Sequence, residues 1–520
     1  MRKFLLLLFV CCTGLLSAQT PTITWEKSIG GTTDDYGYFV NSTADGGFIT
    51  LGSTTSADGD MSANFGGYDV LLSKLDGGGN LQWVKNLGGS LLEEGYSVYQ
   101  TPEGGYLITG DTRSSDIQVS SNYGMRDVWV VKTNAVGTIQ WENTYGGTGD
   151  DRAYYSTPTS DGGYIMAGYT ESSDNDVSSN HGFSDVWVVK IDSAGAIQWE
   201  NTYGGSNYDY GYFIAPTADG GYIVTAYSYS NDADVSGNHG GADIWLFKIN
   251  STGVLQWQKS YGGTNEEYCT ATYPTADGGY ISLNYTYSND GDITSTHGDL
   301  ETWLMKLSGT GAIQWQKCYG GSFADANYAL KKTIDNKYVI AGYAYSGDGD
   351  IVGQHPGGEA DYWIMQTDTS GTIEWSQCYG GTGDDEAFSI IQLADSSFVV
   401  TGLAASTDGD VTANRGAYDA WTIRLKQPGI VTGIADAAAP AVSRKGELAV
   451  YPNPSDGRFT VSSAAESTLY IFDVYGNLIK TAVLSNTRTM IDLSENAKGM
   501  YFARIVSADG TEQNGKLILR

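Results

Sequence analysis

The sequence predicts an all-β protein: a seven-bladed β-propeller closed by an N-terminal strand, followed by a small C-terminal β-sandwich. Gly is abundant at 69 residues and Pro scarce at 10, and aromatic residues are frequent, as in proteins of many short strands joined by tight turns. One Trp recurs seven times at intervals of 58 residues, the last interval being 60, and each is followed by Gly-Gly. The recurring residues are Trp25, Trp83, Trp141, Trp199, Trp257, Trp315 and Trp375. A fixed period of this length indicates a repeat architecture.

Each repeat contains four candidate strands. In the third repeat, the sequence Ser160-Asp161-Gly162-Gly163 has the composition of a tight turn, because Gly permits positive φ. Apolar and aromatic runs flank it, and a longer loop precedes the segment that begins at Asp185. The four strands are expected at 153–157, 164–169, 185–191 and 196–203. Four strands per repeat are typical of a propeller blade, and a repeat of about 58 residues is longer than the usual ~40–50.

The two ends of the repeat region predict that the repeats form a closed ring. The mature chain begins with a lone fourth strand at 22–25, and the last repeat stops after its third strand at 419–424. Pairing these two segments completes a seventh sheet and removes the exposed edges. A solenoid is the alternative, but it would need capping segments, and none is recognisable in the sequence.

Charge and segment composition divide the chain. The formal net charge is −31, and residues 19–428 hold 18 Lys and Arg against 51 Asp and Glu. This balance argues against nucleic acid as a partner, because that requires basic patches. Residues 1–18 read as a signal peptide, residues 429–446 as an Ala-rich linker, and no later stretch is apolar for long enough to form a transmembrane anchor.

Three acidic positions recur in the propeller repeats, and all should lie on one face. They fall four residues after each Gly-Gly, in the loop between the second and third strands, and just before the third-strand aromatic residue. The loop adds an Asn in several repeats, and calcium prefers such oxygen ligands. The candidate calcium ligands in the first and third repeats are Asp58, Asp60, Asn64, Asp69, Asp174, Asp176, Asn180 and Asp185. The alternative is that these side chains accept backbone N–H bonds and shape the turns.

No catalytic motif stands out in the repeats. The sequence lacks a nucleophile elbow, a zinc-binding His pair and a phosphate loop. Departures from the repeat, such as Arg126, Arg152 and the pair Lys331-Lys332, do not make an obvious catalytic set. We therefore favour a binding or adhesion module for carbohydrate or protein. A secreted polysaccharide hydrolase or lyase and a purely structural surface protein remain as alternatives.

The C-terminal segment, residues 447–520, carries a series of separated motifs. They are Val450-Tyr451-Pro452-Asn453-Pro454, Gly457-Arg458-Phe459, Ile471-Phe472-Asp473-Val474-Tyr475-Gly476, Ile491-Asp492-Leu493-Ser494, Lys498-Gly499-Met500-Tyr501 and a terminal Lys516-Leu517-Ile518-Leu519-Arg520. In this order they resemble the type A C-terminal sorting domain of the type IX (Por) secretion system of Bacteroidota. The resemblance implies that the type IX machinery is a partner and that the protein reaches the outer cell surface or the medium through the periplasm. An unrelated small β-domain is the alternative. Such an address says nothing about the chemistry of the cargo.

Overall fold

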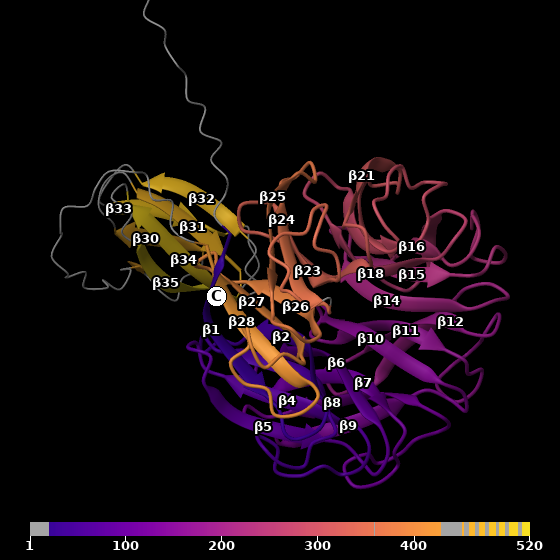
Figure 1. The fold of residues 1–520 in the computed structure, drawn as a ribbon. Helices are drawn as coiled ribbons and strands as arrows, with labels where there is room; N and C mark the ends of the chain where they lie inside the picture. The colour runs from indigo at the N-terminus through magenta and orange to yellow at the C-terminus, as the bar shows by residue number, and fades with distance from the viewer. Residues whose placement is uncertain are drawn as a thin grey trace, which may run out of the picture. The chain divides into compact units, whose positions relative to one another are not determined.

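The computed structural model describes residues 20–357, 359–427 and, near the C-terminus, 450–451, 457–462, 467–473, 478–484, 488–494, 499–507 and 512–519. The chain divides into two compact units, Met1–Pro428 and Gly429–Arg520, and each is described by itself (Figure 1). Throughout the described ranges the regular structure is β, without a helix. The predicted signal peptide and the predicted linker, residues 429–446, lie outside the described residues.

The N-terminal unit consists of seven antiparallel four-stranded sheets. Six of them use consecutive strands. These are β2 (Asp35–Ser42), β3 (Phe48–Thr54), β4 (Asp69–Leu75) and β5 (Leu81–Leu87); β6 (Glu93–Gln100), β7 (Tyr106–Thr112), β8 (Asp127–Thr133) and β9 (Ile139–Tyr145); β10 (Asp151–Pro158), β11 (Tyr164–Thr170), β12 (Asp185–Ile191) and β13 (Ile197–Tyr203); β14 (Asp209–Pro216), β15 (Tyr222–Ser228), β16 (Asp243–Ile249) and β17 (Leu255–Tyr261); β18 (Glu267–Pro274), β19 (Tyr280–Thr286), β20 (Glu301–Leu307) and β21 (Ile313–Tyr319); β22 (Asp325–Lys332), β23 (Tyr338–Ala344), β24 (Asp361–Thr367) and β25 (Ile373–Tyr379).

The remaining sheet joins the two ends of the unit. Its order is β1 (Thr22–Ile29), β28 (Asp419–Lys426), β27 (Phe398–Ala404) and β26 (Asp385–Gln392). The N-terminal strand β1 pairs antiparallel with β28, from Thr22 opposite Lys426 to Ile29 opposite Ala420. The prediction that the N-terminal strand completes the last repeat is therefore confirmed.

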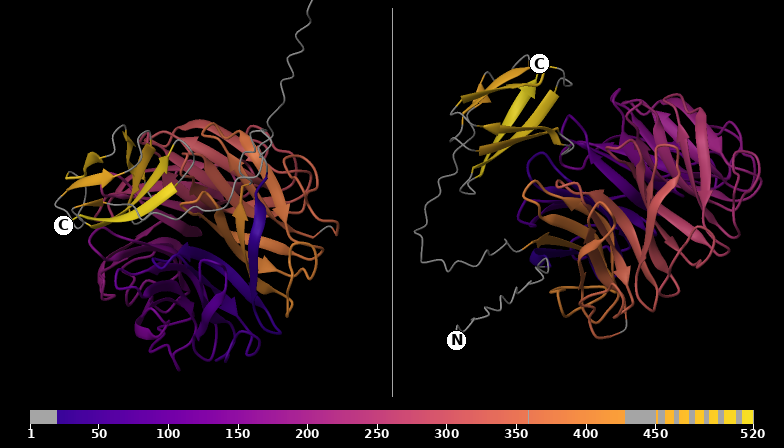
Figure 2. Two further views of the ribbon diagram at one scale, coloured as in Figure 1. Left: turned by 90° about the vertical axis from the view of Figure 1, so that its left-hand side faces the viewer. Right: turned by 90° about the horizontal axis from the view of Figure 1, so that it is seen from above.

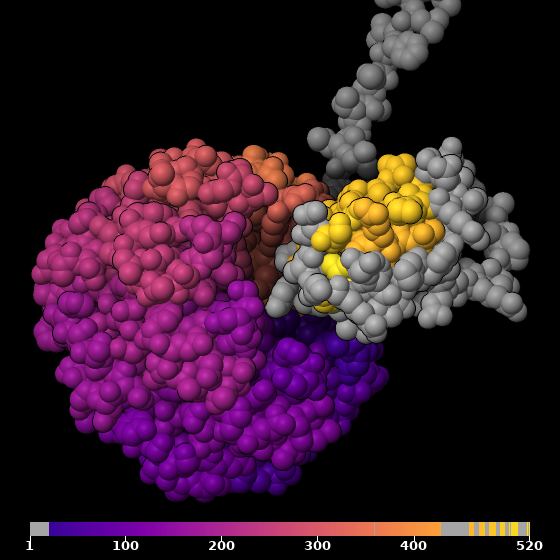
Figure 3. Space-filling model, turned by 180° about the vertical axis from the view of Figure 1, so that it is seen from behind, coloured from indigo at the N-terminus to yellow at the C-terminus, as the bar shows by residue number. Residues whose placement is uncertain are grey.

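The sheets follow one another around the unit in chain order, as the colours of Figure 3 show. The first and last sheets also touch. The Val40 N–H in β2 donates to Ser389 Oγ in β26 at 3.2 Å, and the rings of Tyr38 and Phe388 lie 5.5 Å apart. The sheet that contains β2 thus has packed neighbours on both sides, since β2 and β3 also contact β6.

The repeated Asp-Gly-Gly segments are the turns that the sequence predicts between the first two strands of a sheet. In the third repeat, Asp161 Oδ1 accepts the Gly163 N–H at 3.1 Å, and Gly162 has φ 84°. The same carboxylate forms an ion pair with Lys190 at 2.8 Å, so the turn is tied to β12. Because Gly adopts positive φ without steric cost, this position favours it.

The core of the N-terminal unit is centred on a different Trp from the one that marks the repeat. The third strands of six sheets carry an indole that is almost completely buried between sheets: Trp129, Trp187, Trp245, Trp303, Trp363 and Trp421. Each indole N–H donates to a side chain on the fourth strand, as from Trp187 to Glu200 at 2.8 Å. A buried indole needs such a partner for its polar N–H.

The C-terminal unit contains two antiparallel sheets (Figure 2). One has the order β29 (Val450–Tyr451), β30 (Arg458–Ser462) and β33 (Arg488–Asp492). The other has the order β32 (Leu478–Leu484), β31 (Ser467–Phe472), β34 (Gly499–Ser507) and β35 (Glu512–Leu519). Phe459 and Ile491 from the first sheet share one buried cluster with Leu469 and Ile505 from the second. This shared core is what a small β-sandwich requires.

Candidate functional site

The first two predicted calcium ligands of each loop hold the connection between neighbouring sheets. Asp58 accepts the Thr32 N–H at 2.8 Å and the Thr32 hydroxyl at 2.9 Å. Asp174 does the same with Thr148, at 2.8 and 3.0 Å. Asp60 and Asp176 each accept a Gly N–H at 3.3 Å, and Asp60 also pairs with Arg415 at 2.5 Å. These carboxylates therefore bind backbone and side-chain donors of their own unit.

The predicted asparagine ligands have their polar atoms engaged in the same loops. Asn64 lies in the first repeat and Asn180 in the third. Asn64 donates its amide N–H to the carbonyl oxygens of Thr54 and Gly67, at 3.4 and 3.1 Å, and accepts the Gly66 N–H at 2.8 Å. Asn180 donates to the Thr170 carbonyl and accepts the Gly182 N–H. These are the contacts that the turn-shaping alternative requires.

The last predicted ligand of each loop, Asp69 or Asp185, is completely buried. Asp69 Oδ2 accepts the Phe65 N–H at 2.8 Å, while Oδ1 has no hydrogen-bond partner among the described residues. Asp185 Oδ2 accepts the His181 N–H and contacts His181 Nδ1 at 2.5 Å. Burial raises the pKa of Asp69 to about 6 and also raises that of Asp185.

Each of these third-strand acids faces a first-strand acid of the next sheet, a pairing that the sequence did not reveal. A methyl group on Gly88 would lie 2.5 Å from Asp69 Oδ1 and 2.6 Å from Glu93 Oε2, so the two oxygens lie within about 5 Å. Glu93 in turn accepts the Gly89 N–H at 2.6 Å and the Thr112 hydroxyl at 2.7 Å. The corresponding pairs are Asp419 with Asp35, Asp127 with Asp151, Asp185 with Asp209, Asp243 with Glu267, Glu301 with Asp325 and Asp361 with Asp385.

These contacts favour the turn-shaping interpretation of the recurring acids. The space between the two carboxyl groups holds the first Gly of each Gly-Gly, which explains why that position is Gly in every repeat. In the part of the chain that the structure describes, no group of three or more His, Cys, Asp or Glu side chains has an arrangement that could hold a metal ion. The calcium ligand set stays a prediction.

A recurring first-strand position produces a second feature, an aromatic belt along the first strands. Three residues after the first-strand acid, six sheets carry an aromatic side chain: Tyr38, Tyr96, Tyr154, Tyr212, Tyr328 and Phe388. Neighbouring rings of this series contact one another, with centroids 4.5 to 6.2 Å apart in each pair. The contacts run from Tyr212 through Tyr154, Tyr96, Tyr38 and Phe388 to Tyr328. In the fifth repeat the position is Thr270, so the belt is interrupted there.

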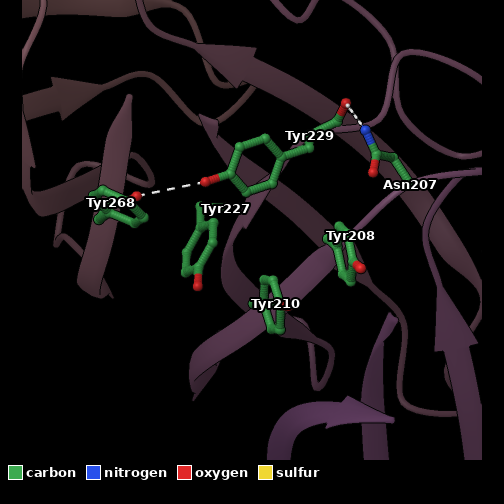
Figure 4. A pocket seen from close by; sticks show the side chains of 6 residues that line it. All are labelled: Asn207, Tyr208, Tyr210, Tyr227, Tyr229 and Tyr268. Carbon is green, nitrogen blue, oxygen red and sulfur yellow. Dashed lines mark hydrogen bonds between the residues drawn. The ribbon is translucent and has the colours of Figure 1, made fainter. Parts of the chain in front are cut away.

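A pocket of 520 Å³ is lined by five tyrosines and one asparagine (Figure 4). They come from the connection before β14, from β14 itself, from β15 and the residue next to it, and from β18. The lining residues are Asn207, Tyr208, Tyr210, Tyr227, Tyr229 and Tyr268.

Contacts within this tyrosine pocket hold its rings in place. The rings of Tyr208 and Tyr210 are parallel within 2° at 6.1 Å, and Tyr227 packs edge-on against Tyr268 at 4.9 Å. The Tyr229 and Tyr268 hydroxyls lie 3.5 Å apart, and Asn207 Nδ2 donates to the Tyr229 carbonyl at 3.3 Å (Figure 4). Tyr208 is 39% exposed, and its ring also stacks on the exposed ring of Phe183 at 4.9 Å.

A second pocket, of 720 Å³, adjoins the first and shares Tyr268 with it. It is lined by Gly241, Thr264, Asn265, Glu266, Tyr268, Tyr287 and Asp299. The two pockets together present tyrosine rings, amide groups and two carboxylates.

A buried cluster of charged side chains joins the second and third sheets. Asp111 in β7 is fully buried and lies 3.4 Å from the Arg126 guanidinium, 3.9 Å from Arg152 Nε and 3.1 Å from the Tyr96 hydroxyl. Burial outweighs the two arginines and raises the pKa of Asp111 to about 7. The structure thus brings Arg126 and Arg152 together. Lys331 lies elsewhere and donates to the Tyr273 hydroxyl at 2.9 Å.

Sequence reasoning missed the tyrosine pocket because its residues are exceptions to the repeat. Tyr208 and Tyr210 flank the first-strand acid Asp209, where the third repeat has Asp150 and Arg152. The signal that could have found the pocket is that the residues on either side of the recurring first-strand acid change from repeat to repeat. These positions cluster because the first strands of successive sheets lie side by side.

Residues 449–520 match the family of secretion system C-terminal sorting domains. The match confirms the resemblance seen in the motifs of this segment. It identifies the C-terminal unit as a type IX sorting tail, which indicates handling by the type IX machinery and export to the cell surface or secretion. In the described ranges, no helix has the length and apolar character needed to cross a bilayer.

Solved structures to which the chain is similar include the Pan2 WD40 domain of Neurospora crassa, at 10% identity and TM-score 0.43, covering 79% of this chain and 97% of that chain. A fungal alcohol oxidase of the AA5 family, in complex with copper, is 12% identical with TM-score 0.48, covering 96% and 99%. PorZ, a surface component of the type IX secretion system of Porphyromonas gingivalis, is 10% identical with TM-score 0.22, covering 96% and 86%. No curated protein matches the chain. At these identities and TM-scores, the likenesses say nothing about what the chain binds.

Proposed function

We propose that this exported protein is a closed seven-bladed β-propeller that binds carbohydrate without catalysing a reaction on it. Seven four-stranded sheets, the pairing of β1 with β28 and the contact between the first and last sheets support the closed ring. A ring leaves only short, protected edges, which suits a protein that must stay folded outside the cell.

The tyrosine pocket is the observation that carries the binding function. Sugar rings have apolar C–H faces that pack on aromatic faces, and hydroxyl groups that hydrogen-bond to amide and phenol groups. The pocket offers both: the exposed ring of Tyr208, the hydroxyls of Tyr229 and Tyr268, and the Asn207 amide. Ring-to-ring contacts fix these groups before a ligand arrives, which lowers the entropic cost of binding.

The chemistry of the pocket lining supports binding over catalysis. None of the six residues that line the tyrosine pocket carries a carboxyl, imidazole or thiol group; the two carboxyl groups nearby, Glu266 and Asp299, line the adjoining pocket. Glycoside hydrolysis uses a pair of carboxylates on either side of the scissile bond.

Binding of the full chain to a panel of soluble polysaccharides, measured by affinity electrophoresis, tests the proposal. We expect at least one polysaccharide to retard the protein, and Tyr208→Ala or Tyr268→Ala to weaken that binding about tenfold, as expected for losing about 1.4 kcal/mol of aromatic contact. Tyr123→Ala is the matched control, because Tyr123 is 46% exposed and lies outside the pocket.

Two outcomes would contradict this function. If no polysaccharide in the panel is retarded, or if the pocket variants bind as well as the wild-type chain, the tyrosine pocket is not a carbohydrate site. Release of new reducing ends from a bound polysaccharide would instead favour the hydrolase alternative.

A further inference from the structure

The second pocket contains a carboxylate that tyrosines of the first pocket hold in position. Glu266 Oε1 accepts a hydrogen bond from the Tyr229 hydroxyl at 3.3 Å, and Oε2 accepts one from the Tyr268 hydroxyl. Tyr229 and Tyr268 both line the first pocket, and Glu266 lines the second. The negative charge of Glu266 is therefore fixed at the boundary between the two cavities.

The residues that line the two pockets add negative charge and no positive charge. Asp299 also lines the second pocket and is exposed. Neither pocket has a Lys, Arg or His among its lining residues. Residues 19–428 as a whole carry 18 Lys and Arg against 51 Asp and Glu, so the field around the pockets attracts cations and repels anions.

The aromatic rings reinforce this preference. Tyr287 is 46% exposed in the second pocket, and Tyr268 borders both pockets. A tyrosine face attracts an ammonium group within about 6 Å through its quadrupole. A carboxylate between tyrosine rings therefore recognises a protonated amine more strongly than a neutral group of the same shape.

We infer that the ligand is a glycan with protonated amino groups, such as a polymer of glucosamine, whose sugar rings lie on the tyrosines and whose ammonium group pairs with Glu266. This inference rests on the proposed carbohydrate binding and names its substrate class. The same charges disfavour uronic-acid polymers, because their carboxylates would face Glu266 and Asp299.

Isothermal titration of the full chain with glucosamine hexamer and with N-acetylglucosamine hexamer tests the inference. The two ligands have the same ring framework and differ in the charged amine. At low ionic strength we expect the glucosamine hexamer to bind at least tenfold more tightly, with an affinity that falls as salt is added.

Variants separate the charge from the aromatic contacts. Glu266→Gln keeps an acceptor for the two hydroxyls but removes the charge, so it should abolish most of the preference for the glucosamine hexamer over the acetylated hexamer. Tyr268→Ala should weaken both hexamers. Glu103→Gln is the control, because the Glu103 side chain is 69% exposed and lines neither pocket. Melting curves of each variant establish that it is folded.

The outcomes distinguish this inference from the function on which it rests. Equal or tighter binding of the acetylated hexamer overturns the cationic ligand but leaves carbohydrate binding in place. Retention of the preference in Glu266→Gln overturns the role of Glu266. Tighter binding of a lysine-rich peptide than of either hexamer overturns the saccharide class. If neither hexamer nor any polysaccharide of the panel binds, the proposed function itself fails.

Discussion

Replacing Asp69 with Asn should stabilise the N-terminal unit at neutral pH. Asp69 is completely buried, its Oδ1 lacks a partner among the described residues, and it faces Glu93 across Gly88. The amide of an Asn at this position keeps an oxygen for the Phe65 N–H and gains an N–H₂ group that can donate to Glu93. The substitution also removes one member of a buried pair of like charges.

The expected size follows from the pKa of Asp69. Burial, and secondly the charge of Glu93, raises this pKa from 3.8 to about 6. The folded state therefore holds the proton more tightly than the unfolded state, so the wild-type free energy of unfolding falls as pH rises from about 4 to about 6. A shift of about 2 pKa units corresponds to about 3 kcal/mol, as an upper estimate, and Asp69→Asn is free of this decline.

Thermal unfolding of the full chain at pH 4 and at pH 7.5 measures the effect. For a unit of about 400 residues, about 3 kcal/mol shifts the Tm by about 3 to 4 °C. We expect the Tm of Asp69→Asn minus the Tm of wild type to rise by up to this amount between pH 4 and pH 7.5. Asp58→Asn is the control: Asp58 is exposed, its side chain bonds Thr32, and it does not belong to the buried pair of Asp69 and Glu93.

A loss of stability in Asp69→Asn at both pH values would refute this reasoning. It would mean that the ionised carboxylate is needed in the fold, as a metal ligand would be. Added calcium that raises the Tm of the wild-type chain but not that of Asp69→Asn would point to the same conclusion.

Three further predictions concern the same unit. Gly88→Ala should destabilise the fold by about 2 to 4 kcal/mol, because the new methyl group meets two carboxyl oxygens, whereas Gly78→Ala, with its nearest neighbours at 3.3 Å, should be tolerated in the same melting assay. Arg126→Gln should lower the free energy of unfolding by about 3 kcal/mol at pH 8 and by less at pH 5. Asp111, with a pKa of about 7, is ionised at pH 8 and has lost its nearer guanidinium, whereas at pH 5 it is protonated; equal losses at both pH values would contradict this. Excess calcium should move the Tm by less than about 1 °C relative to chelator, because Asp58 and Asp60 already accept hydrogen bonds; a large rise that Asp58→Asn abolishes would establish the calcium site.

The repeat architecture could be predicted because its framework positions recur. Gly-Gly, as after Trp141, marks one connection in every repeat, Asp-Gly-Gly, as at Asp161, marks a second in four of them, and strand alternation fills the space between the two. Counting strands at the two ends was enough to pair β1 with β28. The sorting tail was recognisable because its motifs are separated and ordered.

The sites were much less predictable, since they depend on contacts between sheets. The pairing of Asp69 with Glu93 joins two sheets across a Gly, and nothing in either repeat alone indicates which acids face each other. The tyrosine pocket draws Tyr208, Tyr229 and Tyr268 from neighbouring sheets. The sequence argument treated uniformity between repeats as its signal, whereas the pocket lies where that uniformity breaks.

A crystal structure of the full chain with a retained oligosaccharide tests the central claim most directly. Carbohydrate binding by the tyrosine pocket predicts a sugar ring against Tyr208 or Tyr268, with hydroxyl groups bonded to Asn207 or Tyr229. An oligosaccharide bound at another surface of the chain, with the tyrosine pocket left open to solvent, would contradict it.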